Sequence, residues 1–252
     1  MTRMQAMTAM LMLAAMATAA VAQTSSQPSN ADLAAAIKQA TDATDTATAL
    51  AKATQMEASA VKDSAWASNT RTLANLTWKS GRHAEAASFL AARAAALADE
   101  TRDLTPPVPD QRRANIVGGC LDIIKLEAQP TAKAALARTA LAADEKSTPA
   151  FTALYTALVA DKKHDEALRA CLDYMDKAAT AEAMRARRVA LLTTLKRADD
   201  LKAEAMEYLK VSTDAAAATK ALAHVLPTDD VALCCGLTAQ QVERIFEAFQ
   251  QA

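Results

Sequence analysis

The stretch from Leu73 to Ala96, LANLTWKSGRHAEAASFLAARAAA, decides the fold, because two amphipathic helical segments meet in it at a short polar turn. Leu73 and Leu76 lie on one face of the first segment. The second segment has an apolar face of its own, formed by Ala86, Phe89, Leu90 and Leu97. Gly81 stands in the turn, where glycine can take up left-handed backbone. The stretch therefore predicts a pair of helices joined at Gly81.

The composition extends this prediction to the whole chain. Ala is its most frequent residue and the best helix former. The 252 residues include only 4 Gly and 7 Pro, and neither type occurs between residues 150 and 226. No run of alternating Val, Ile or Thr has the length of a strand. These features predict an all-α fold.

The charge distribution and the absence of known motifs argue against several classes of function. The chain has 28 Lys and Arg against 29 Asp and Glu, and the two signs are interspersed without a basic stripe. We therefore expect no nucleic-acid partner. Because no nucleophile elbow, metalloprotease motif, phosphate loop or dinucleotide fingerprint occurs, we expect neither catalysis nor a cofactor.

Residues 1–22 have the pattern of a secretory signal peptide. Arg3 precedes an apolar run, and Ala20-Val21-Ala22 fits the small-x-small cleavage rule, which predicts Gln23 as the mature N-terminus. The alternative is a membrane anchor, but the run is short for a bilayer. We expect an exported protein, periplasmic or secreted, without a membrane segment after cleavage. A flexible linker over 23–29 then leads to a single helical-repeat domain over 30–252.

Helix signals recur along that domain. Asn30 is the predicted cap of a helical pair over 31–60, and Asp110 that of a helix over 111–127. Two later apolar stripes are Phe151, Leu154, Tyr155, Leu158, and then Leu168, Cys171, Leu172, Met175. The other predicted helices are 66–78, 83–97, 130–143, 181–196, 201–211, 214–225 and a terminal capping helix that begins at Thr238.

The pair around Leu73 resembles a tetratricopeptide repeat. The matching positions are Leu73, Ala74, Gly81, His83, Ala86 and Leu90, and a later pair matches at Phe151, Leu154, Ala167 and Leu168. A third match is weaker, because Glu204 replaces the small residue. The resemblance covers residues 66–211 and implies stacked antiparallel helical hairpins, an α-solenoid. A generic α-solenoid or helical bundle is the alternative.

The resemblance also implies a function, since such repeats present a concave surface to a protein or peptide. The positions that match this groove include Thr152, Thr156 and Thr193, and the candidate binding residues are Arg71, Asn75, Trp78, Lys79, Lys196 and Arg197. A groove with one Trp and several cations suits a peptide with an acidic or carboxylate end. Alternatively, Trp78 packs under the neighbouring hairpin.

The four cysteines suggest a different function. Cys120 and Cys171 lie on apolar stripes, which is typical of buried thiols. Export would favour a disulfide among Cys171, Cys234 and Cys235, and the adjacent Cys234-Cys235 pair could serve a redox or metal-handling protein. A purely structural envelope component is a third possibility. We expect an exported, non-enzymatic scaffold that binds a protein or peptide.

Overall fold

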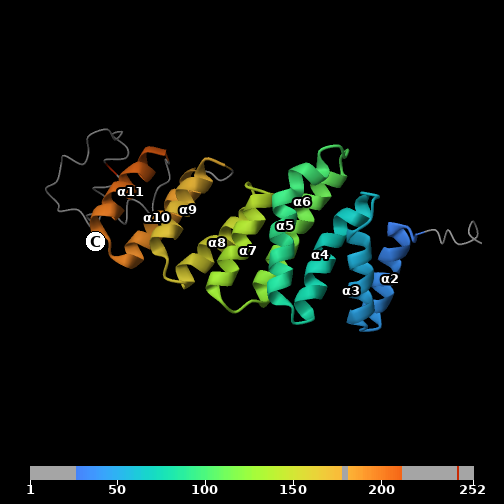
Figure 1. Cartoon of the computed structure of the whole chain (residues 1–252). Coiled ribbons are helices and arrows are strands. Elements are labelled where there is room, and N and C mark those ends of the chain that lie inside the picture. Colours follow the sequence, from blue (N-terminus) through green and yellow to red (C-terminus); the bar gives the residue numbers. More distant parts are fainter. Residues whose placement is uncertain (1–26, 178–180, 212–242, 244–252) are drawn as a thin grey trace, which may run out of the picture. The chain divides into compact units, whose positions relative to one another are not determined.

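The computed structural model describes residues 27–177, 181–211 and 243, and every regular element in this part of the chain is a helix (Figure 1). This confirms the all-α prediction. The signal peptide, the predicted helix over 214–225 and the capping helix lie outside the described residues, apart from Glu243. The helices are α2 (Asn30–Asp42), α3 (Thr46–Glu57), α4 (Ser64–Lys79), α5 (His83–Thr101), α6 (Val108–Leu126), α7 (Pro130–Ala143), α8 (Thr148–Ala160), α9 (His164–Met175), α10 (Ala181–Leu195) and α11 (Ala198–Val211).

The chain forms two compact units, of which the first ends at Val61. In this unit α2 packs against α3. Ser29 begins α2 with a capping box: its hydroxyl accepts from the Asp32 amide at 3.2 Å, and the Asp32 carboxylate accepts from the Ser29 amide at 3.1 Å. The predicted cap at Asn30 is therefore wrong. Asn30 is buried inside the helix, and its Nδ2 donates to the Val61 carbonyl at 2.8 Å.

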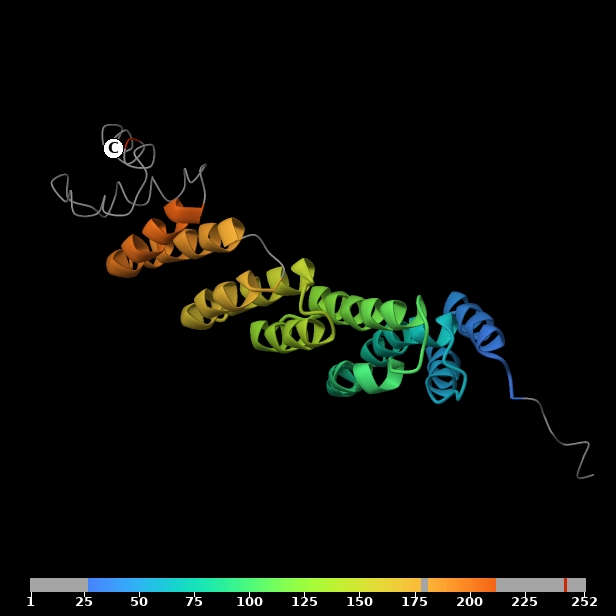
Figure 2. The same ribbon diagram turned by 90° about the horizontal axis from the view of Figure 1, so that it is seen from above.

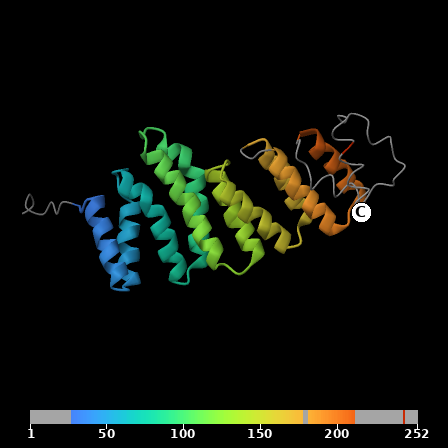
Figure 3. The ribbon, with the colours of Figure 1, turned by 180° about the vertical axis from the view of Figure 1, so that it is seen from behind.

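The second unit begins at Lys62, and α6 is the helix with the most neighbours in it. It packs against α4, α5, α7 and α8, and Figures 2 and 3 show α6 and α7 side by side. Gly118 and Gly119 make the close approach to α4 and α5 possible. A Cβ on Gly119 would lie 3.1 Å from Leu90 Cδ2 and 3.6 Å from Arg71 Cα. A side chain at position 119 would therefore contact a buried residue of α5 and the backbone of α4.

The start of α6 also differs from the prediction. The helix begins at Val108, after Pro107, so Asp110 lies in its first turn and is not its cap. The next turn buries Arg112 completely. Its guanidinium carbon lies 3.9 Å from the centre of the Trp66 ring. The guanidinium nitrogens donate to the Thr70 hydroxyl and, at 3.2 Å, to the Glu100 carboxylate. A buried cation thus joins α4, α5 and α6.

The remaining helices pack in succession, α7 against α8, α8 against α9, α9 against α10 and α10 against α11. Most of the two predicted apolar stripes is buried, but Leu172 is 41% exposed. Tyr174 is buried in its place, stacked on Phe151 at 4.3 Å between ring centres. Tyr174 follows Cys171 by three positions and therefore lies on the same face of α9. Its contact with Phe151 explains why Tyr174 is buried there and Leu172 is not.

The weakest repeat match, at Glu204, has a physical explanation in the structure. Glu204 is 6% exposed and accepts from Arg185 at 2.9 Å and from Arg188 at 2.8 Å. Arg188 also donates to the carbonyl of Leu168. The buried carboxylate of Glu204 is accommodated here because two arginines of α10 compensate its charge.

Gly119→Ala tests the close packing of α6. Each glycine-to-alanine change in a helix interior gains about 1 kcal/mol of helix propensity. At position 119 the new methyl would press on fully buried Leu90, and overpacking of a core costs about 1–3 kcal/mol. Gly118→Ala is the matched control, because its methyl meets only the flexible side chain of Arg71. We expect Gly119→Ala to be less stable than the control by at least about 1 kcal/mol in urea unfolding. Equal stabilities would contradict this account of α6.

Candidate ligand-binding groove and pocket

Two of the predicted binding residues come together on α4. Arg71 donates to the two carboxylate oxygens of Asp122 on α6, at 2.7 and 3.0 Å, and Asn75 Nδ2 donates to the same carboxylate at 3.1 Å. These hydrogen bonds, chiefly those from Arg71, hold the pKa of Asp122 below its usual value. The same contact raises the pKa of Arg71. Arg71 and Asn75 therefore join α4 to α6, and half of the Arg71 side chain remains exposed.

Trp78 lies differently from the prediction. Its side chain is 8% exposed and belongs to the core cluster that includes Ala74, Ala86 and Leu90. Its ring stacks on His83 at 4.0 Å between ring centres. The indole is not presented to a groove, because the turn at Gly81 brings α5 back against it. The burial favours the alternative, packing under neighbouring helices.

The other candidates are separate from this cluster. Lys79 and Lys196 are exposed, and Lys196 takes up left-handed backbone in the turn before α11. Arg197 forms ion pairs with Asp165 and, at 2.7 Å, with Asp200. It lines a charged cleft of about 350 Å³ with Arg188 and Glu204. The ion pairs of Arg197 thus connect it to α9 and to α11.

A groove of about 850 Å³ lies between α6, α7 and α8. We call it the α6–α8 groove. Two lysines, Lys125 and Lys133, stand among mostly small and apolar side chains, and both Thr152 and Thr156, expected at groove positions, line it. Its other lining residues are Leu121, Ile124, Ala128, Pro130, Thr148, Pro149, Ala153, Ala157 and Ala160. This volume is typical of ligand sites in proteins.

Both charged side chains that line the groove are lysines. Lys133 has no ion pair in the described part of the chain. The Lys125 ammonium lies 3.8 Å from Asp122, whose carboxylate Arg71 and Asn75 already occupy. Arg187 of α10 donates to the Thr152 hydroxyl at 3.3 Å and lies over the rings of Phe151 and Tyr155. The groove therefore combines an apolar surface with cations at its edges.

Sequence reasoning found the threonines of this groove but missed both lysines. One signal for the groove was present: Ala153, Ala157 and Ala160 follow one another at helical spacing on α8. Small side chains in such a row leave a furrow along a helix. The lysines come from α6 and α7, and no spacing within α8 could have indicated them.

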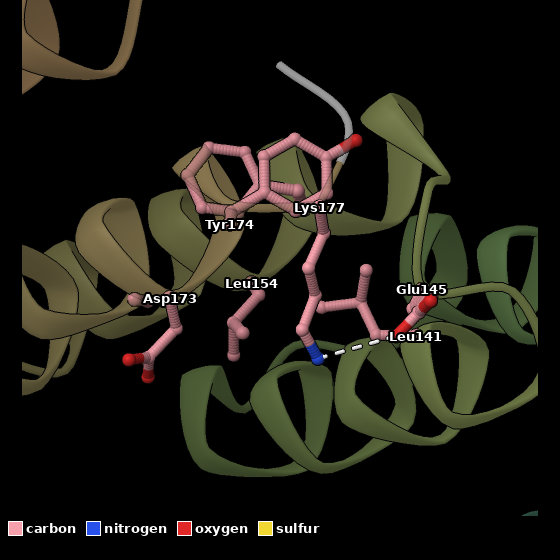
Figure 4. Close-up of a pocket in the computed structure, with 8 residues that line it drawn as sticks. Leu141, Glu145, Leu154, Asp173, Tyr174 and Lys177 are labelled. Carbon is pink, nitrogen blue, oxygen red and sulfur yellow. Dashed lines mark ion pairs between the residues drawn. The ribbon is translucent and has the colours of Figure 1, made fainter. Parts of the chain in front are cut away.

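A second, smaller pocket lies between the ends of α7, α8 and α9. It has a volume of about 160 Å³ (Figure 4). Leu141, Leu154 and Ala170 provide aliphatic walls, and the stacked Phe151 and Tyr174 rings close one side. The charged lining residues are Glu145, Asp173 and Lys177. Tyr174 is held by a hydrogen bond from its hydroxyl to the Lys146 carbonyl at 2.9 Å.

The cysteines that the structure describes are buried, as their apolar stripes predicted. Cys120 and Cys171 are free thiols, and burial raises their pKa values to about 12 and about 11. Such thiols are unreactive at neutral pH. Cys234 and Cys235 lie outside the described residues, so the disulfide prediction stays a prediction. Among the residues described, no group of three His, Cys, Asp or Glu is placed to hold a metal ion.

Comparisons with known proteins add no family. No protein-family model, curated protein or solved structure matches the chain. The resemblance to tetratricopeptide repeats therefore rests on the residues alone. Within the described residues, no helix has the length and apolar character needed to span a bilayer.

Trp78→Ala distinguishes packing from binding. Removing a buried Trp costs about 3–5 kcal/mol, because the cavity relaxes only partly. We expect a loss of this size in the free energy of unfolding, measured by urea titration. Lys79→Ala, at the exposed neighbouring position, should stay within about 0.5 kcal/mol of the wild type. A loss below about 1 kcal/mol for Trp78→Ala would contradict the buried placement.

Asp122→Asn tests the contact between α4 and α6 through its pH dependence. Because the pKa of Asp122 is lowered in the folded state, its contribution to stability is complete above the unfolded value of about 3.9 and disappears as the pH falls through the folded value. We expect the variant to be less stable by about 1 kcal/mol at pH 7, since Arg71 is half exposed. The difference should shrink as the pH falls below about 3.9 and vanish once the pH is below the lowered folded-state pKa of Asp122. A difference independent of pH would remove the ion pair as its cause.

Proposed function

We propose that this chain is an exported, non-enzymatic scaffold that holds an acidic segment of a protein or peptide in the α6–α8 groove. The observation that carries the proposal is the groove itself, about 850 Å³ lined mostly by small and apolar side chains with Lys125 and Lys133 among them. Small residues let a peptide backbone come close, and the ammonium groups complement carboxylates. The signal-peptide pattern over 1–22 supports the export part of the proposal, with a periplasmic or secreted location.

A tetratricopeptide-like arrangement of antiparallel hairpins is part of the proposal. Three small positions that carry the resemblance, Ala74, Ala86 and Ala167, are completely buried. Short turns join α4 to α5 and α8 to α9, and α6 packs against helices of the pairs before and after its own. This is the packing expected where each pair buries its apolar face on its neighbours.

The groove has the chemistry for an extended segment with an acidic residue. Apolar walls favour short aliphatic side chains of the partner through burial. The acidic residue would lie between Lys125 and Lys133, and Arg187 adds positive charge beyond Thr152. Because these cations are partly solvated, we expect them to select the partner more than to supply most of the affinity.

A peptide-library selection on the mature protein tests the proposal. We expect bound peptides to be enriched in Asp and Glu, and the Lys125→Glu/Lys133→Glu variant to bind them about tenfold more weakly or worse, since each lost charge contact costs up to about 1 kcal/mol. Ala153→Trp, which fills the groove, should abolish binding.

Lys52→Glu on α3 is the matched control, because it reverses one charge at a position that does not line the groove. Its peptide affinity should equal that of the wild type. The proposal fails if no peptide binds, or if Lys52→Glu weakens binding as much as the groove variant does. Circular dichroism of every variant excludes unfolding as the cause.

A further inference from the structure

The small pocket beside α9 has the size and walls of a site for a compact organic molecule. Its volume of about 160 Å³ is close to that of the engineered apolar cavities that take up benzene. Leu141, Leu154 and Ala170 line it with aliphatic carbon, and the Phe151–Tyr174 stack makes one side rigid. Tyr174 cannot swing away easily, because its hydroxyl is bonded to the Lys146 carbonyl and to Thr148. The walls are therefore already in place.

Among the residues that line the pocket, two carboxylates face one ammonium group. Lys177 forms an ion pair with Glu145 at 3.4 Å, and Figure 4 shows this pair and the Asp173 carboxylate on opposite sides of Leu154. Asp173 is exposed and forms no ion pair or hydrogen bond within the described part of the chain. Its charge thus has no partner at the pocket edge.

The position of Asp173 in its helix adds to this negative potential. Asp173 lies in the last turn of α9, which contains no basic residue. The carbonyl groups at a helix C-terminus carry partial negative charge, so an anion there is unfavourable and a cation is favourable. The helix end and the carboxylate both favour a positive group at this point.

We propose that this pocket binds a small organic amine, with its apolar body against Leu141, Leu154 and Ala170 and its ammonium on Asp173. A neutral molecule of the same shape would leave the carboxylate without a partner, and an anion would be repelled by it. This site is separate from the α6–α8 groove, with which it shares no lining residue. It would allow the scaffold to carry an amine ligand on the other side of α8.

Benzylamine is a suitable probe, with benzyl alcohol and benzoate as neutral and anionic counterparts of the same size. Binding is followed by NMR titration of the amide signals of Leu154, Ala170 and Tyr174 in the full mature chain. We expect saturable shifts with benzylamine and affinities at least about fivefold weaker for both counterparts, which corresponds to one charge-assisted contact at an exposed site.

Two variants locate the ammonium. Asp173→Asn should weaken benzylamine about fivefold. Asp176→Asn is the matched control, because Asp176 is a second exposed carboxylate at the same helix end but does not line the pocket. Its affinity should be within about twofold of the wild type, since nothing in the pocket changes.

Ala170→Leu, which fills the pocket from its wall, should abolish the shifts while the circular dichroism spectrum stays helical. The proposal is overturned if benzyl alcohol binds as tightly as benzylamine, if the two Asp variants lose affinity equally, or if Ala170→Leu binds normally. Absence of saturable shifts at the three pocket amides would overturn it as well.

Discussion

The close contact of α6 with α4 and α5 is the constraint on which the second unit depends. Gly118 and Gly119 remove two side chains at the crossing, so that the backbone at Arg71 and the side chain of Leu90 reach the α6 surface. Because α6 also packs against α7 and α8, its position sets that of the helices before and after it. The α6–α8 groove is one product of this placement, since two of its walls are α6 and α7.

Buried charged side chains also help to specify how neighbouring helices pack. Arg112 is enclosed between Trp66, Thr70 and Glu100, and Glu204 lies between Arg185 and Arg188. Such contacts add little net stability compared with a well-packed apolar core, but breaking one partner is costly. Both networks join different helices, so their hydrogen bonds require those helices to be aligned as observed. We therefore interpret them as devices that fix how neighbouring helices align.

The helix α8 separates two surfaces of different chemistry. Its Thr and Ala positions line a groove edged by lysines, whereas Phe151 and Leu154 belong to the core and border a small pocket whose carboxylates outnumber its one ammonium group. Opposite charge on the two sides is consistent with two ligands of opposite sign, an acidic segment and an amine. A single helix can serve both because residues two positions apart point in different directions.

The sequence by itself determined the all-α class and the order of the helices in the described part, with several helix ends displaced by two to four residues. Helix periodicity, Pro starts and the turn at Gly81 are local signals, which is why they could be read from the sequence. It also indicated the threonines of the groove. Only the tertiary structure decided that Trp78 is buried, that Asn75 and Arg71 bind Asp122, and that Lys125 and Lys133 share a groove with α8. These facts depend on contacts between helices distant in the chain. The angle at which one helix crosses another is set by side-chain fit such as that at Gly119, and periodicity within either helix does not contain it.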